Sequence, residues 1–270
     1  MSVQTAYDKA RAEDRAALVG YLPAGFPSCE GAIEAAKAMV DAGCDVIEIG
    51  LPYTDPMMDG PTIQDAVHQA LVGGVRVADV FRTVEAVSAT GVPTLVMTYW
   101  NPVDHYGVDS FARDLASAGG SGLITPDLTP EEGGAWLAAS DGHGLDRVFL
   151  VALSSTDERI KTITSACRGF VYAASLMGVT GARTAVDTGA PQLVERTRAI
   201  IGESGRELPI GLGLGVGNGA QAAEVAGFAD GVIVGSAYVR RLLDAPDLAS
   251  GVAGVRALTE ELAAGVRKGR

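Results

Sequence analysis

Residues 30–50, EGAIEAAKAMVDAGCDVIEIG, contain one complete unit of the pattern that decides the fold. Alanines recur at helical spacing in the first part, which ends at Gly43, and glycine commonly follows the last turn of a helix. The segment 45–50 is a short apolar run, typical of a buried strand. The stretch therefore predicts a helix that is followed directly by a strand.

The same alternation recurs along the chain. Strands that alternate with helices form parallel βαβ units, and eight such units close into a TIM barrel. A doubly wound open sheet is the alternative, although it usually needs fewer strands. We predict one TIM-barrel domain over residues 1–270, with a short helix before the first strand. The eight candidate strands are 17–22, 45–50, 94–99, 122–126, 148–153, 170–175, 209–214 and 231–236.

Composition narrows the class of protein. Hydrophobic residues make up 47% of the chain and charged residues 20%, which is typical of a compact α/β protein. A net charge of -12 disfavours nucleic acid, and no apolar run approaches the roughly 20 residues that span a bilayer. The polar opening lacks a signal-peptide centre, so we expect a cytoplasmic protein. Three cysteines without metal-ligand spacing predict neither a disulfide framework nor a zinc site.

Glu48 is an acid inside an apolar strand. Alternate side chains of a strand face opposite ways, so Ile47 and Ile49 share one face while Val46 and Glu48 share the other. If the isoleucines pack against the helices, Glu48 points into the barrel near its C-terminal mouth, where an unpaired carboxylate is costly to bury. Such an acid is a candidate catalytic group. The alternative is a strand-end side chain that faces solvent or pairs with a structural lysine.

Two connections are longer than a simple βα unit needs, and long loops of compact domains are usually functional. The first, residues 51–61 (LPYTDPMMDGP), carries Asp55 and Asp59. Acids beside proline and glycine also form turns, and Asp59 could equally cap the next helix or reach the mouth. The second, residues 176–189 (LMGVTGARTAVDTG), follows the sixth strand. Both begin at the barrel face where such enzymes build their sites.

Glycines end the seventh strand in residues 211–219 (GLGLGVGNG), and the eighth strand ends in Gly235 and Ser236. Glycines let backbone N–H groups approach an anion, and a helix that opens near Asn218 would add its N-terminal dipole. Paired loops after strands seven and eight form the phosphate site common in TIM barrels. We therefore predict a phosphate site there, with a purely structural glycine run as the alternative.

A dinucleotide-binding fingerprint is the rival interpretation of these glycines. Gly215, Gly217 and Ala220 fit its G-x-G-x-x-G/A spacing, but the spacing is weak evidence alone. The fingerprint also needs an acid about 20 residues further on, at the end of the next strand. That strand ends instead in Gly235 and Ser236, which favours phosphate over a nucleotide.

Six ordered motifs extend along nearly the whole chain: GYLPAGFP (20–27), EIGLPYTDPMMDGPTIQDA (48–66), MTYWNP (97–102), GLITPDLTPEE (122–132), GVTGAR (178–183) and GVIVGSA (231–237). Together they resemble those of the tryptophan synthase alpha subunit family. The family cleaves indole-3-glycerol phosphate to indole and glyceraldehyde 3-phosphate in a retro-aldol reaction, on a TIM barrel. The resemblance implies no cofactor in this chain and a beta subunit partner, in an alpha2beta2 complex, that binds pyridoxal phosphate and receives the indole.

The resemblance also implies the roles of the two acids. Glu48 would be the general acid-base that serves indole C3 and the glycerol hydroxyl, and Asp59 would hold the indole N–H. Desolvation should raise the pKa of Glu48, whereas Asp59, on a loop with more water, would more easily stay ionised. A stand-alone lyase, and a silent barrel that only binds a beta-type partner, are the alternatives; the intact acids argue against the second.

Further site residues follow from the same resemblance. Gly213, Gly215, Gly235 and Ser236 match the phosphate-binding loops, and Thr180 and Gly181 match the mobile loop after strand six. Tyr172 matches a tyrosine near the catalytic acid, or is a barrel-core aromatic. Asp127 matches a supporting residue, or caps a helix. Leu176, Met177 and Gly217 depart from the common pattern, and the three histidines have no partners at ligand spacing. No metal site is expected.

Overall fold

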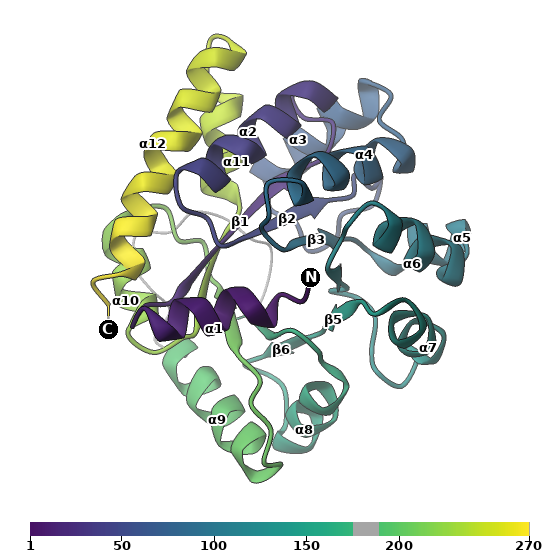
Figure 1. Cartoon of the computed structure of the whole chain (residues 1–270), viewed down its shortest axis with the longest axis vertical. Coiled ribbons are helices and arrows are strands. Elements are labelled where there is room, and N and C mark those ends of the chain that lie inside the picture. Colours follow the sequence, from purple (N-terminus) through teal and green to yellow (C-terminus); the bar gives the residue numbers. More distant parts are fainter. Residues whose placement is uncertain (175–188, 270) are drawn as a thin grey trace.

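The computed structural model describes residues 1–174 and 189–269, and its strands form one parallel sheet rolled around a central axis (Figure 1). The spatial order is β5-β4-β3-β2-β1-β9-β8-β7-β6. All eight predicted strands are confirmed within a few residues. The strands are β1 (Ala17–Pro23), β2 (Val46–Gly50), β3 (Thr94–Met97), β4 (Gly122–Ile124), β5 (Asp146–Val148), β6 (Leu150–Ala152), β7 (Val171–Ala174), β8 (Ile210–Gly213) and β9 (Gly231–Val234).

The fifth predicted strand is split at Phe149 into β5 and β6. The first half pairs with β4 and the second with β7, so both edges of the sheet meet in one continuous stretch of chain. The carbonyl of Phe149 itself accepts the N–H of Tyr172 at 3.1 Å. The sheet therefore closes into a TIM barrel, and the open doubly wound sheet is wrong for this chain.

Helices follow the strands and cover the outside of the barrel (Figure 1). Side chains at several N-caps accept a backbone N–H of the first turn, as Ser28 does from Gly31 at 3.0 Å. The described helices are α1 (Gln4–Ala12), α2 (Cys29–Asp41), α3 (Pro61–Val72), α4 (Val77–Ser88), α5 (Trp100–Tyr106), α6 (Val108–Ser117), α7 (Gly134–His143), α8 (Asp157–Ala166), α9 (Ala190–Glu203), α10 (Gly219–Ala226), α11 (Ser236–Leu243) and α12 (Leu248–Val266).

Two apolar clusters separate the inside of the barrel from the helix layer. Ile47 and Ile49 belong to the larger cluster between sheet and helices, whereas Val46 belongs to the smaller cluster inside. The alternation predicted for this strand is confirmed, and it places Glu48 on the inner side. The strand periodicity of two therefore decides which side chains reach the site.

Helix α1 precedes the first strand, and its buried residues pack into the inner cluster at the N-terminal end of the barrel, a position that the sequence did not predict (Figure 1). Its Tyr7 is buried in the inner cluster, with its ring 5.3 Å from that of Phe170. The buried carboxylate of Asp146 holds the start of this helix, because it accepts the Val3 N–H at 2.7 Å. The inner cluster thus fills the N-terminal part of the barrel interior with apolar side chains.

The structure also bears on the cysteines and on the possibility of a membrane-spanning helix. Cys29, Cys44 and Cys167 are free thiols, which confirms that they make no disulfide framework. Within residues 1–174 and 189–269, no helix has the length and apolarity that crossing a membrane requires.

Candidate active site

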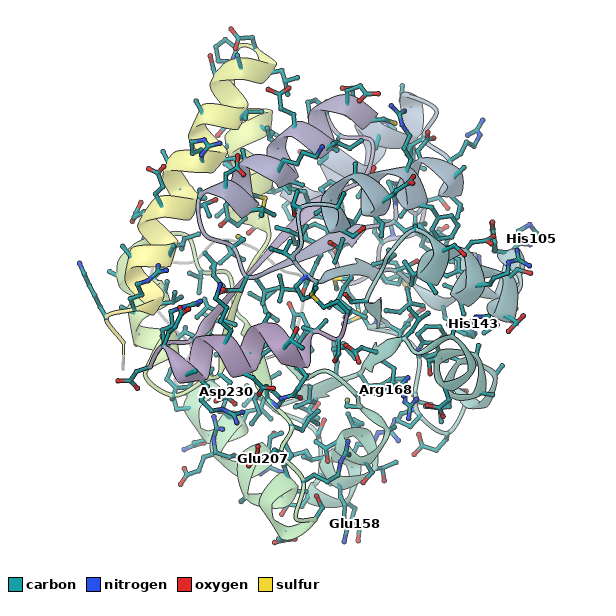
Figure 2. All side chains as sticks on the ribbon, in the orientation of Figure 1. His105, His143, Glu158, Arg168, Glu207 and Asp230 are labelled. Carbon is teal, nitrogen blue, oxygen red and sulfur yellow. The ribbon has the colours of Figure 1, made fainter. Side chains whose placement is uncertain are left out.

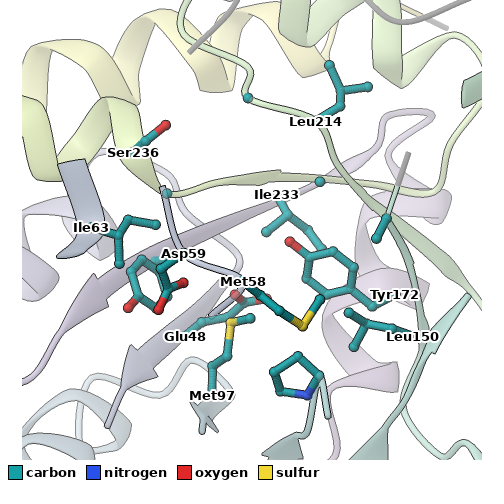
Figure 3. Close-up of a pocket in the computed structure, with 16 residues that line it drawn as sticks. Glu48, Met58, Asp59, Ile63, Met97, Leu150, Tyr172, Leu214, Ile233 and Ser236 are labelled. Carbon is teal, nitrogen blue, oxygen red and sulfur yellow. The ribbon is translucent and has the colours of Figure 1, made fainter. Parts of the chain in front are cut away.

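A cavity of about 100 Å³ lies at the C-terminal end of the barrel strands (Figure 3). It brings together seven residues that the sequence predicted from five separate segments. Thr180 and Gly181, and the departures Leu176 and Met177, lie outside the described residues. The seven predicted residues on its wall are Glu48, Asp59, Tyr172, Gly213, Gly215, Gly235 and Ser236.

Glu48 is 1% exposed, and its Oε1 has no hydrogen-bond partner in the described part of the chain. The side chain neither faces solvent nor pairs with a lysine of the described residues. The alternative interpretation, a solvent-facing or lysine-paired Glu48, is therefore wrong. Burial raises the pKa of Glu48 from 4.5 to about 8. The side chain is therefore mainly protonated at neutral pH and lies against an open cavity.

The raised pKa of Glu48 makes stability depend on pH. Between 4.5 and about 8 the folded protein holds a proton that the unfolded chain has released, so this stabilising term is complete below 4.5 and is lost as pH rises through 8. Glu48→Gln has no such proton. We expect the unfolding free energy of the parent to fall, relative to Glu48→Gln, by about 1 kcal/mol per pH unit from pH 6 to 8. Urea unfolding at several pH values measures this, and parallel curves would contradict it.

Asp59 lies near the end of loop two, residues 51–60, and only Gly60 separates it from α3. Its N–H donates to the carbonyl of Pro56 at 3.2 Å, and its carbonyl accepts Nε2 of Gln64 at 2.8 Å. Its carboxylate accepts the hydroxyl of Tyr99 at 3.4 Å. Backbone and side-chain bonds thus hold the loop with the carboxylate on the cavity wall.

Burial raises the pKa of Asp59 to about 6, although the Tyr99 hydroxyl lowers it. Asp59 is thus less hydrated than a loop position predicts, but its pKa stays below that of Glu48. Near pH 7, Asp59 is therefore mainly ionised and Glu48 mainly protonated. Asp55, by contrast, is exposed and accepts the hydroxyl of Thr54 at 2.6 Å, as a turn residue would.

The glycine turns lie across the cavity from Glu48 (Figure 3). Gly215 has a φ of 81°, in the left-handed region that favours glycine. Helix α11 begins at Ser236, and no side chain of the described residues caps its first turn. Uncapped N–H groups and the positive end of the helix dipole suit an anion at this place.

The helix that opens at Asn218 contributes less than the sequence predicted. Gly219 donates its N–H to Glu261 at 2.8 Å, Gln221 donates to Asn218 at 2.9 Å, and Gly217 donates to the Gln221 side chain at 2.8 Å. Side chains, one of them an acid, already occupy the start of α10. This occupation argues against the expected contribution of the α10 dipole to phosphate binding, and it also disfavours a dinucleotide there.

Apolar side chains form the sides of the cavity between the acids and the glycine turns (Figure 3). Two of these side chains are Met97, the last residue of β3, and Leu150, the first residue of β6, and neither stands out in the sequence. A flat aromatic group would fit between apolar walls of this kind. The remaining side chains that the sequence did not single out are Tyr21, Met58, Ile63, Pro126, Ala174, Leu214 and Ile233.

Tyr21 has a detectable sequence signal, since it stands near the end of the first strand and pairs in register with Glu48. Its ring occupies space that glycine leaves: a Cβ on Gly50 would come within 2.3 Å of the Tyr21 hydroxyl oxygen. Tyr172 does the same at Gly213, where a Cβ would lie 2.2 Å from its hydroxyl oxygen. Tyr172 therefore lines the cavity, although it is also packed in the barrel.

Other predicted candidates lie away from the cavity. The carboxylate of Asp127 accepts the N–H of Trp100 at 2.9 Å, so it caps α5, which is one of its two predicted roles. His105 and His143 lie at the periphery of the molecule (Figure 2), and His68 is exposed. Among residues 1–174 and 189–269, no group of histidine, cysteine and acidic side chains could hold a metal ion.

Comparisons with known proteins agree with this geometry. The family profile described as tryptophan synthase alpha chain matches residues 7–267. The chain is 65% identical to the tryptophan synthase alpha chain of Salinispora arenicola, over 98% of this chain and 97% of the relative. It is 62% identical to that of Salinispora tropica, with the same coverage. A solved structure of Mycobacterium tuberculosis tryptophan synthase superposes with a TM-score of 0.91 at 57% identity, covering 98% of each chain. The chain therefore belongs to the tryptophan synthase alpha chain family.

Proposed function

We propose that this chain cleaves indole-3-glycerol phosphate to indole and glyceraldehyde 3-phosphate. The observation that carries the proposal is the cavity itself: a buried, unpaired Glu48 carboxyl and the Asp59 carboxylate face a small apolar space that ends at an uncapped helix N-terminus. The acids can serve the reacting carbons and the indole nitrogen, and the turn at Gly235 and Ser236 can take the phosphate. We further propose that residues 1–270 form one domain, since all described strands join one sheet.

The cleavage requires two proton movements, and one group can perform both. Glu48, protonated near neutrality, donates its proton to indole C3, which makes the ring an electrophilic indolenine. The resulting carboxylate then takes the proton of the glycerol hydroxyl as the carbon–carbon bond breaks, so the electron pair of that bond returns to the ring and an aldehyde forms. Glu48 ends the cycle protonated, as it began.

Asp59 stabilises the charge that this route creates. Protonation at C3 puts positive charge on the indole nitrogen, and an ionised carboxylate that accepts its N–H lowers the energy of that state. A pKa of about 6 keeps Asp59 mainly ionised at pH 7. The two acids are thereby suited to different roles by the difference in their pKa values.

The family implies partnership with a beta subunit. We propose an alpha2beta2 complex in the cytoplasm, in which the partner binds pyridoxal phosphate and receives indole, while this chain uses no cofactor, metal, nucleic acid or membrane. The C-terminal face carries the cavity mouth, so a partner there would receive indole directly.

An indole-release assay with and without a beta subunit tests both activity and partnership. We expect release of indole from indole-3-glycerol phosphate by this chain, and a rate at least tenfold higher when the beta subunit is added, because a partner that orders the mouth excludes water and fixes the reacting groups. Full activity alone would identify a stand-alone lyase. Absence of cleavage in both arms, despite binding of the partner, would identify a silent barrel.

A further inference from the structure

Tyr99 connects the end of strand β3 to the loop that carries Asp59. The side chain is 7% exposed, and its hydroxyl oxygen lies 2.9 Å from the backbone nitrogen of Met58 and 3.4 Å from Oδ2 of Asp59. One hydroxyl thus contacts the backbone and the carboxylate of two successive residues of loop two. Tyr99 does not line the main cavity.

The direction of these two hydrogen bonds is fixed by chemistry. The backbone N–H of Met58 is a donor only, so the Tyr99 oxygen must accept there. The ionised Asp59 carboxylate is an acceptor only, so the hydroxyl proton must point to it. Rotation of the hydroxyl away from Asp59 would lose that bond without gaining one from Met58.

Tyr99 is itself held in place by the barrel. Its carbonyl accepts the hydroxyl of Thr98 at 2.9 Å, and the next N–H, that of Trp100, is bound by Asp127. The ring packs against that of Tyr53, with centroids 5.5 Å apart. The position of the Asp59 carboxylate therefore depends, through Tyr99, on the segment that follows β3 and not only on its own loop.

We propose that Tyr99 is a positioning residue that orients the Asp59 carboxylate toward the cavity before substrate or partner binds. The inference rests on the proposed function for the role of Asp59, but the orientation itself is a property of the free chain. The other ionisable groups on the same cavity are Glu48 from β2, Tyr21 from β1 and Tyr172 from β7. Without the hydroxyl, the carboxylate would lose its only side-chain hydrogen-bond donor among the described residues and rotate more freely.

Tyr99→Phe removes the hydroxyl and keeps the ring. The matched control is Tyr53→Phe, which removes the hydroxyl of the neighbouring ring. That hydroxyl accepts a hydrogen bond from the Asn101 side chain at 3.2 Å and makes none to Asp59 in the described structure. The direct measurement is the pKa of Asp59 in the full chain without substrate, followed by the ¹³C shift of labelled aspartate carboxyl groups. Asp59→Asn identifies the signal by its loss.

We expect the pKa of Asp59 to rise by about half a unit to one unit in Tyr99→Phe, because a donor to the ionised form is lost, and to be unchanged in Tyr53→Phe. In the complex with a beta subunit, the acid limb of the kcat/KM profile should move up by the same amount. We expect about a five- to tenfold loss at pH 7, because the carboxylate is less well oriented; the pKa shift alone would account for less than about twofold of it. Thermal unfolding confirms that both variants are folded.

An Asp59 pKa that is the same in Tyr99→Phe and the parent would overturn the proposal. An equal shift in Tyr53→Phe would also overturn it, because the effect would then belong to the ring pair. A shifted pKa in a chain that releases no indole with its partner would instead leave the positioning intact and refute the proposed function, so the two failures are distinguishable.

Discussion

Glu48→Gln is expected to lower the rate of indole release at saturating substrate by about a thousandfold, within the range of general acid-base catalysis. Glutamine keeps the shape of the side chain but neither donates a proton to C3 nor accepts one from the glycerol hydroxyl. Because both proton steps use this group, kcat should fall far more than KM rises. Single-turnover release of indole in the complex with a beta subunit measures the loss.

The control for Glu48 is Glu34→Gln, since Glu34 is an exposed acid on α2, outside the cavity. It should leave cleavage within twofold of the parent, by the small effects typical of surface substitutions. The fold of Glu48→Gln should be intact, because the parent side chain is already mainly uncharged near neutrality. A folded Glu48→Gln protein that turns over at a near-parental rate would refute the assignment of the acid.

Asp59→Asn is expected to lower kcat/KM by about a hundredfold, as the loss of one preorganised electrostatic contact commonly does. The amide keeps the size of the side chain but carries no charge to offset the positive indole nitrogen. The acid limb that reports ionisation of this group, near the pKa of about 6, should vanish from the pH profile. Rates from pH 5 to 8 measure both effects.

Asp55→Asn is the matched control on the same loop. The Asp55 side chain is exposed, and among the described residues its hydrogen-bond partner is the neighbouring Thr54, so its substitution should change kcat/KM by less than threefold. If the two variants lost the same activity, the loop conformation and not the Asp59 charge would be responsible.

The fold could be predicted because one local rule repeats through the chain. Alternation in 45–50 assigned Ile47 to the helix layer and Glu48 to the interior, and the two apolar clusters confirm this division. The break at Phe149 could not be predicted, since an unbroken apolar run gives no sign of where pairing passes from one neighbour to the other.

The candidate site was predictable where a residue type is unusual in its setting, as an acid is in a strand or a glycine series at a strand end. Tyr99 escaped notice because an aromatic residue after a strand is ordinary, and its importance depends on two contacts with a distant loop. Glu261 at the start of α10 escaped for a similar reason: it lies on α12, 42 positions along the chain from Gly219.

Helix α1 makes the two ends of the barrel different. Tyr7 and its apolar neighbours fill the N-terminal end of the barrel, below Glu48. The cavity lies at the opposite, C-terminal end, so substrate and both products would pass that face. A protein that docks on that face stands between the cavity and solvent, and it can therefore affect the entry of substrate and the exit of both products.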